Sequence, residues 1–422
     1  MSKRTDRILR LVDSNRKEIL SLASNLVRIP SENPPGDTAQ IASLIEEYLK
    51  EHGIGTETHE PAEGRVSVIG RLGRRGGRGL IFNGHMDTVP IGDVDRWSFP
   101  PLRGMIEGGV LYGRGSVDMK GGLAAMMAAQ RLLVEFEDQL GGSLILTAVA
   151  DEETGGALGA EWLVRNGVIS GDACVVGEPS ALGLCRIGEK GICFLRLTTM
   201  GVPCHGSVPM LGDNAILTMT KAIKAVLKLY DQEVETPIGL RDVVEESKRL
   251  IVQQSGVEET MNVMDRCTVN VGLIRGGTKV NIVPDACTIE VDIRVPHGLV
   301  VKEVVQRVEK LLAENVKGEV GVEVASSTDP TVTPPKDPIV ALLCENARRI
   351  LGASPSLFIQ QSATDARHLR LQGIPSVSYG PGNGVKYAHA YDEQIRVGDI
   401  VQATKIYLCT ALDYLASVNS PL

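Results

Sequence analysis

Strand-like and helix-like stretches alternate between residues 40 and 180, and this alternation constrains the fold more than any other feature of the chain. "GLIFNGH" (79–85) and "GSLILTAVADEE" (142–153) contain short apolar runs, typical of strands that are buried on both faces. Between them, "GGLAAMMAAQRLLVEF" (121–136) reads as a helix too apolar for the surface. The alternation predicts an α/β fold: a three-layer domain around a mainly parallel sheet.

The order of the predicted strands and helices changes after residue 186. From 187 to 326 the order is strand, helix, two strands, helix, strand, which is the pattern of a split-βαβ, ferredoxin-like α+β sandwich. The chain then returns to helix–strand alternation and ends with a helix near 397–416. We therefore predict one domain formed by 1–186 and 327–422, with a second domain, 187–326, inserted into it.

Composition excludes several classes of function. A net charge of −8 and 4% aromatic residues disfavour a nucleic-acid groove, which needs a basic face with stacking rings. The one dense basic run, "RLGRRGGRG" (71–79), is predicted to be a solvated hairpin turn. The first 30 residues lack the apolar core of a signal peptide, and no segment has the length of apolar sequence that a membrane span requires. We predict a cytoplasmic protein that binds neither nucleic acid nor membrane.

The eight cysteines are scattered singly, without a C-x-x-C pair. Such spacing does not indicate a structural zinc site or a redox centre. We predict that they are small buried residues.

Five stretches place His, Asp or Glu where an apolar strand or a glycine-rich turn ends. They contain His85 and Asp87, Asp118, Glu152 and Glu153, Glu178, and His389. Each has a simpler interpretation when taken alone: a hydrogen-bonded core histidine, a helix N-cap, a solvated turn. Residues two apart in a strand share a face, however, and open α/β sheets bind ligands at the carboxyl edge of their strands. Together, the five stretches predict one cluster at that edge.

The chemistry of this predicted cluster favours metal ions. Imidazoles and carboxylates without thiolates suit zinc, manganese or cobalt. The acids outnumber what one ion needs, and the adjacent Glu152 and Glu153 would repel each other without a cation or a proton between them. Two divalent ions bridged by one carboxylate would use the surplus and would generate a hydroxide at neutral pH.

The chain resembles the two-zinc amidohydrolases and exopeptidases that include acetylornithine deacetylase, succinyl-diaminopimelate desuccinylase, aminoacylases and glutamate carboxypeptidases. The resemblance covers nearly the whole chain and rests on an ordered set of motifs: "GHMDTVP", "GRGSVDMKGG", "ADEETGG", "GEPS", "HGSVP", "GGTKVNIVPDACTIEVDIR", "SATDARHL" and "YAHAYDE". It implies a catalytic domain with an inserted lid and dimerisation domain. It also implies two divalent ions, most simply Zn²⁺, with Co²⁺ or Mn²⁺ as alternatives.

The resemblance assigns a role to each residue of the predicted cluster. The implied metal ligands are His85, Asp118, Glu153, Glu178 and His389, with Asp118 as the bridge between the two ions. Asp87 would accept a hydrogen bond from the second ring nitrogen of His85. Glu152 would be the general base, taking a proton from the bridging water and giving it to the departing amine.

Further roles follow for residues outside the cluster. His205 resembles the lid histidine that hydrogen-bonds the oxyanion, and Asn281 and Arg294 resemble lid residues that hold the substrate carbonyl and carboxylate. The backbone at Gly380 and Gly382 would face the substrate. Each of these residues also fits a plain structural role, as a loop cap or a polar group at a sheet edge.

The implied activity is hydrolysis of the amide bond of an N-acyl amino acid through attack by a metal-bridging hydroxide. A dipeptidase or carboxypeptidase would use the same site on a short peptide, and the sequence does not separate the two. A two-metal phosphatase or nuclease would need a more basic surface, and a catalytically inactive binding module would not need the full ligand set. The resemblance also implies a homodimer through the lid, although residues 232–265 form a longer lid segment than the compact relatives have.

Overall fold

The computed structural model describes residues 3–74 and 76–416, and its chain divides into two compact units. Unit 1 comprises Met1–Ile187, Val332–Phe358 and Thr364–Leu422. Unit 2 comprises Gly188–Thr331 and Ile359–Ala363. The sequence-based divisions were placed at 186/187 and 326/327, without the short return at 359–363.

Unit 1 is built on a nine-stranded sheet in the order β1-β2-β6-β3-β7-β15-β8-β13, with β14 paired to β8. Its strands are β1 (Gly55–His59), β2 (Ser67–Gly73), β3 (Gly79–His85), β6 (Ser143–Val149), β7 (Ala173–Val176), β8 (Leu184–Glu189), β13 (Thr331–Val332), β14 (Ser356–Gln360) and β15 (Ser376–Ser378). The four central strands β6, β3, β7 and β15 run parallel, while β1, β2 and β8 pair antiparallel at the flanks. Every residue of β3 is buried, as its unbroken apolar sequence predicts.

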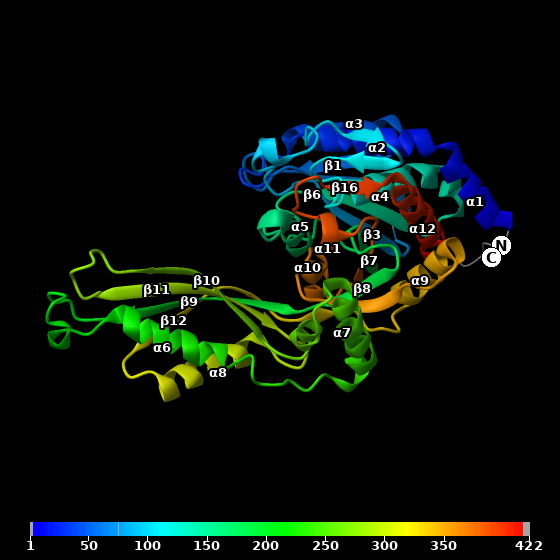
Figure 1. The fold of residues 1–422 in the computed structure, drawn as a ribbon. Helices are drawn as coiled ribbons and strands as arrows, with labels where there is room; N and C mark the ends of the chain where they lie inside the picture. The colour runs from blue at the N-terminus through cyan, green and yellow to red at the C-terminus, as the bar shows by residue number, and fades with distance from the viewer. Residues whose placement is uncertain (1–2, 75, 417–422) are drawn as a thin grey trace. The chain divides into compact units, whose positions relative to one another are not determined.

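Helices cover both faces of this sheet and give unit 1 three layers (Figure 1). The helices are α1 (Lys3–Ser14), α2 (Arg16–Arg28), α3 (Ala39–Glu51), α4 (Lys120–Leu133), α5 (Ala160–Arg165), α9 (Pro338–Leu351), α10 (Ala366–Leu371), α11 (Gly384–Tyr387) and α12 (Val397–Leu415). Ile81 packs with residues of α5 and α10, whereas the neighbouring Phe82 contacts Tyr407 of α12 on the other face. This alternation along β3 is what a strand between two helical layers requires. The α/β class and the three-layer architecture are confirmed.

The prediction of a hairpin at 71–79 is wrong. Strand β6 lies between β2 and β3, so the two strands that this segment joins are not neighbours in the sheet. Local turn chemistry indicated the bend, but the insertion of β6, which begins only at Ser143, is a long-range event that turn residues do not encode. Arg75, within this segment, lies outside the described residues.

Unit 2 contains a four-stranded antiparallel sheet in the order β10-β11-β9-β12. The strands are β9 (Gly191–Met200), β10 (Thr268–Gly276), β11 (Ala286–Val295) and β12 (Val320–Thr328), and helices α6 (Ala215–Leu227) and α8 (Val301–Asn315) lie along one face (Figure 1). The chain order βαββαβ with this strand order is the predicted split-βαβ arrangement. Within the lengthened segment, α7 (Arg241–Ser255) is followed by a 3₁₀ stretch, Glu258–Val263.

A third sheet, in the order β16-β5-β4, belongs to unit 1 and is formed by β4 (Met105–Glu107), β5 (Val110–Tyr112) and β16 (Gln394–Arg396). Six of the eight cysteines are buried, and Cys204 and Cys344 are partly exposed. Across the part of the chain that the structure describes, no helix combines the length and the apolar character needed to span a membrane.

Helix α4 lies unusually close to the end of β7 because of a glycine. A Cβ placed on Gly122 would lie 2.2 Å from the carbonyl oxygen of Gly177, the residue that follows β7. Because backbone cannot move aside as a flexible side chain can, this approach is open only to glycine. It fixes the first turn of α4 against the loop that carries Glu178.

Gly122→Ala should therefore destabilise the protein by about 1–3 kcal/mol, the usual cost of overpacking. The matched control is Gly398→Ala in α12, because among the described residues no neighbouring atom lies within 4 Å of its added Cβ. The control should be neutral or stabilising by up to about 1 kcal/mol through helix propensity. Urea unfolding of the three proteins measures both effects. Equal stability of Gly122→Ala and wild type would contradict the close packing.

Candidate functional site

Two groups of side chains in unit 1 each bring three potential metal-binding atoms together, and Asp118 belongs to both. One group is His85, Asp118 and Glu178, and the other is Asp118, Glu153 and His389. Within each group the candidate ligand atoms all lie within 4.8 Å of one another. The structure thus gathers at one place five residues that are spread over three hundred positions of the sequence.

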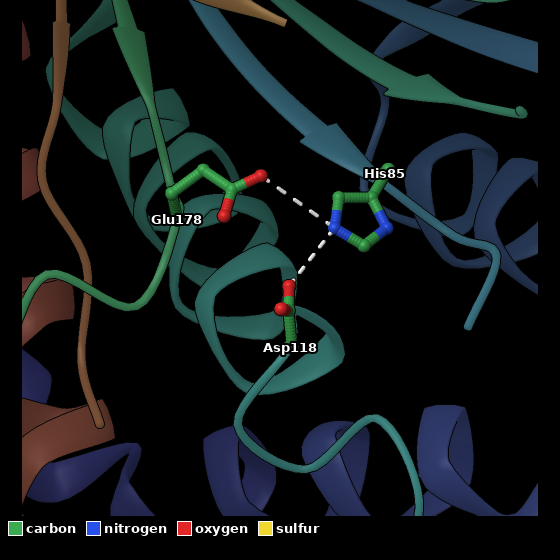
Figure 2. A group of neighbouring side chains, drawn as sticks. All are labelled: His85, Asp118 and Glu178. Atoms are coloured by element: carbon green, nitrogen blue, oxygen red, sulfur yellow. Dashed lines mark hydrogen bonds and ion pairs between the residues drawn. The ribbon is translucent and has the colours of Figure 1, made fainter. Parts of the chain in front are cut away.

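The first group joins the ends of two parallel strands to the start of a helix (Figure 2). His85 is the last residue of β3, Glu178 follows β7, and Asp118 lies in the loop that leads into α4. The Nε2 atom of His85 lies 3.1 Å from Asp118 Oδ1 and 3.6 Å from Glu178 Oε1. The carboxyl ends of neighbouring parallel strands meet at one sheet edge, which is why residues 93 positions apart converge here.

The second group uses the other oxygen of the same carboxylate. His389 Nε2 lies 3.4 Å from Asp118 Oδ2 and 3.2 Å from Glu153 Oε2. Glu153 lies in a single 3₁₀ turn, Glu152–Thr154, at the end of β6, and His389 lies just beyond α11. His389 has a φ of 61°, a left-handed conformation that is unfavourable for a residue with a side chain.

Asp87 links the segment that follows His85 to the turn that carries Glu152 and Glu153. Its carboxylate accepts the backbone N–H of Glu152 at 3.2 Å and that of Glu153 at 3.1 Å, and it also accepts a hydrogen bond from Asn33 at 2.9 Å. His85 Nδ1 lies 2.9 Å from the backbone oxygen of Asp87 and 3.6 Å from its carboxylate. The shorter contact is therefore to the main chain, while the carboxylate chiefly fixes the turn that presents the two glutamates.

Glu152 is half-buried beside the two groups. Burial and the neighbouring charge of Glu178 raise its pKa well above the usual value, and proximity to His85 opposes this shift. Asp365 adds to the same rise. A carboxyl group whose pKa is raised in this way is suited to exchanging protons.

The electrostatics of the cluster favour a bound cation. Burial and the charge of Asp118 raise the pKa of Glu178 to about 8. Hydrogen bonds to Asp118 and Glu153 raise the pKa of His389 to about 10. Burial alone would lower the pKa of His85, yet its hydrogen bond to Asp118 and the nearby carboxylate of Asp87 raise that pKa well above the usual value. Protons thus compensate a surplus of negative charge, and divalent cations bound by the same nitrogen and oxygen atoms would displace them.

The predicted residues of unit 2 lie on two adjacent stretches and one strand. His205 forms an isolated bridge with Ile282, and Gly206 donates its N–H to the oxygen of Asn281 at 2.8 Å, so the "HGSVP" and "KVNIVP" motifs lie side by side. His205 is exposed, with Nδ1 2.7 Å from Ser207 Oγ. These two stretches line one cavity of about 510 Å³.

Arg294 already has a carboxylate partner within unit 2. Its Nε and Nη2 atoms lie 2.9 and 3.0 Å from the two oxygens of Asp292, and its guanidinium lies 5.8 Å from the ring centroid of Phe194. A substrate carboxylate bound by this guanidinium would have to share it with Asp292 or displace Asp292.

Gly380 and Gly382 are buried. A Cβ on Gly380 would lie 2.2 Å from the oxygen of Gly177 and 2.6 Å from that of Glu178. Gly382 has a φ of 89°, which favours glycine. Gly380 therefore packs against the backbone around Glu178, and the contact of both glycines with substrate remains a prediction.

Sequence reasoning gave no role to Asn33 or Asp365. Asn33 Nδ2 lies within hydrogen-bond distance of Asp87, Asp151 and Thr154, and so ties the β3 exit loop to the β6 exit loop. Asp365 accepts a hydrogen bond from Asn83 at 3.1 Å and has one buried oxygen with no partner among the described residues. Asp365 lies within the quoted "SATDARHL" motif, which could have identified it. Nothing in "SENPPG" distinguishes Asn33 from an ordinary turn residue.

The chain is similar to known proteins in both sequence and fold. The model of peptidase family M20/M25/M40 matches residues 81–413. The succinyl-diaminopimelate desuccinylase of Cereibacter sphaeroides is 30% identical over 411 residues, covering 94% of this chain and 99% of that protein. An M20 family metallo-carboxypeptidase from Sulfolobus solfataricus superposes with a TM-score of 0.78 at 20% identity, covering 94% and 99% of the two chains.

A second solved structure, a dinuclear metal-binding peptidase of the M20 family from Bacillus subtilis, superposes with a TM-score of 0.66 at 15% identity over 96% of this chain and 99% of that one. At these identities the structural likeness establishes the fold. The family match extends over most of the chain and contains all five residues of the two groups. The chain belongs to peptidase family M20/M25/M40 and is a metal-dependent hydrolase with likeness to the desuccinylases.

Proposed function

We propose that unit 1 binds two divalent cations, with Asp118 as the shared ligand. His85 and Glu178 complete one position, and Glu153 and His389 complete the other. The observation that carries this proposal is that the two oxygens of Asp118 face different imidazoles, at 3.1 and 3.4 Å. Nitrogen and oxygen donors without thiolates favour zinc, with cobalt or manganese as alternatives.

The reaction is hydrolysis of an amide bond. Divalent cations held by these residues would supply an activated water and positive charge for the oxyanion. Glu152 would take a proton from the attacking water and pass it to the departing nitrogen, a role that its raised pKa supports. Asp87 keeps Glu152 and Glu153 in a fixed turn through their backbone N–H groups.

The substrate is an N-acyl amino acid, with an N-succinyl amino acid as the first choice. Likeness over almost the full length to a desuccinylase supports this choice. His205 is proposed to donate to the oxyanion, and Asn281 and Arg294 are proposed to hold the substrate carbonyl and carboxylate. The alternative is a dipeptidase or carboxypeptidase that acts on a short peptide, because an acyl group and an aminoacyl group present the same amide to this site. The cytoplasmic location also stays a prediction.

We further propose a homodimer formed through unit 2. Strand β10 is an edge of its sheet and exposes Leu273 and Ile274, which are 48% and 56% exposed. An exposed apolar edge strand is a surface that pairs readily with another chain. Sedimentation velocity at micromolar concentration should show a dimer that Ile274→Glu dissociates. Val94→Glu, at a 60% exposed valine of unit 1, is the control. A monomeric wild-type protein would refute the dimer.

Metal titration tests the proposed ligands directly. Calorimetry of the metal-free protein should give two zinc ions per chain, one after either His85→Ala or His389→Ala, and weakened binding of both after Asp118→Asn. His52→Ala, at a histidine that bonds the oxygen of Tyr48, is the control and should retain two. Because His389, with a pKa of about 10, must lose its proton to bind a cation, affinity should rise with pH. One ion per wild-type chain would contradict the shared ligand.

A substrate panel tests the reaction. N-succinyl and N-acetyl amino acids, dipeptides and phosphoesters should be offered to protein loaded with zinc, cobalt or manganese. Preferred cleavage of N-succinyl amino acids is expected, and preference for dipeptides would favour the alternative.

Glu152→Gln provides the test of the general base. It should bind two ions and lower kcat by about 10² or more. Near-normal turnover by Glu152→Gln would refute the role of Glu152 as general base.

In the substrate panel, cleavage of phosphoesters alone would overturn the assignment of the reaction as amide hydrolysis.

A further inference from the structure

A fully enclosed ion pair joins the two loops that carry Asp118 and His389. Arg114 precedes Asp118 by four residues, and Glu393 follows His389 by four. Arg114 Nη1 lies 2.7 Å from Glu393 Oε2, and the two residues are 3% and 0% exposed. Neither residue belongs to the groups of potential ligands, and the proposed reaction uses neither.

The Glu393 carboxylate accepts hydrogen bonds from four donors, all on the Asp118 loop. Oε1 accepts the N–H of Val117 at 2.8 Å and that of Asp118 at 3.0 Å. Oε2 accepts the N–H of Gly115 at 3.0 Å as well as the Arg114 guanidinium. The carboxylate therefore fixes the backbone that leads directly into the shared ligand.

Arg114 also donates hydrogen bonds to the loops that follow His85 and His389. Its Nη1 also donates to the backbone oxygen of Ala390 at 3.2 Å, and its Nη2 donates to that of Pro90 at 3.3 Å. Ala390 is adjacent to His389, and Pro90 lies in the loop that begins after His85. One guanidinium thus contacts all three loops that carry His85, Asp118 and His389.

A buried ion pair is a weak source of stability, because desolvation of the two charges offsets much of their attraction. Here every identified bond of the pair reaches a ligand-bearing loop. His389 in particular needs such support, since its side chain is 54% exposed and its backbone is left-handed.

We propose that Glu393, held by Arg114, is a positioning residue that sets the separation of Asp118 and His389. It thereby stabilises the metal position formed by Asp118, Glu153 and His389 more than the one formed by His85, Asp118 and Glu178. This inference rests on the proposed two-metal function. Glu393→Gln keeps the shape of the side chain but removes the charge and turns one acceptor into a donor that faces N–H groups.

The experiment is cobalt titration of the metal-free full-length protein, followed by calorimetry and by the visible absorption of bound Co²⁺. In Glu393→Gln, the affinity for the first ion should change by less than about threefold. The affinity for the second ion should fall at least about tenfold, which is within the range known for residues that support metal ligands. In a protein that already carries His389→Ala, Glu393→Gln should change the affinity for the one remaining ion by less than about threefold.

Three further proteins sharpen the test. Glu393→Asp keeps an anionic acceptor and should recover part of the second affinity. Asp265→Asn removes a second ion pair, Lys248–Asp265 at 2.6 Å in unit 2, whose side chains are 14% and 12% exposed, and should leave both affinities unchanged even if it lowers the unfolding temperature. Arg114→Lys keeps the positive charge but lacks the two-pronged guanidinium, and it should lower the affinity for the second ion less than Glu393→Gln does. If Glu393→Gln does not fold, the affinities of Arg114→Lys test the proposal instead.

The outcomes separate the two proposals. If wild type binds fewer than two ions, the proposed function fails. If wild type binds two and a folded Glu393→Gln binds both as tightly, or if both positions weaken equally, the positioning role is overturned while the two-metal function stands. An Arg114→Lys protein with unchanged affinities, when Glu393→Gln does not fold, overturns it as well.

Discussion

The carboxylate of Asp118 faces two imidazoles with its two oxygens, and the rest of the functional site is arranged around that contact. Glu178 and Glu153 add negative charge on either side, and burial makes the repulsion between these acids costly. Such an arrangement is stable only with compensating positive charge. Raised pKa values favour protonated rings at His85 and His389, and a pair of divalent ions would supply a larger positive charge at the same place.

The fold makes this concentration of charge possible because the ligand-bearing segments end at one edge of a rigid sheet. Strands β3, β6 and β7 are parallel neighbours, so the residues that follow them emerge together. The glycine contacts at Gly122 and Gly380 bring α4 and the β15 exit loop against the backbone around Glu178. The carboxylates of Asp87 and Glu393 then accept hydrogen bonds from backbone N–H groups and so fix the irregular turns outside the helices and strands. The sheet, the close glycine contacts and the two buried carboxylates therefore all help to position the same ligand side chains.

The sequence predicted what depends on local pattern and on motif order. Apolar runs ending in His, Asp or Glu indicated β3, β6 and β7 and the edge at which they meet, and the βαββαβ order indicated unit 2. Sequence reasoning failed where the determining contact is distant: β6 enters between β2 and β3, which turn residues at 71–79 do not reveal. Asn33 and Glu393 went unassigned because their importance lies in the groups that they bind: distant side-chain oxygens for Asn33, and backbone N–H groups of a distant loop for Glu393.

The central claim, that one carboxylate is shared by two metal ions, is tested most directly by anomalous X-ray diffraction from crystals of the zinc-loaded protein. The account predicts two anomalous peaks about 3.5–4 Å apart, one beside His85 and Glu178 and the other beside Glu153 and His389, with Asp118 between them. A single peak, or two peaks with Asp118 bonded to only one, would contradict it.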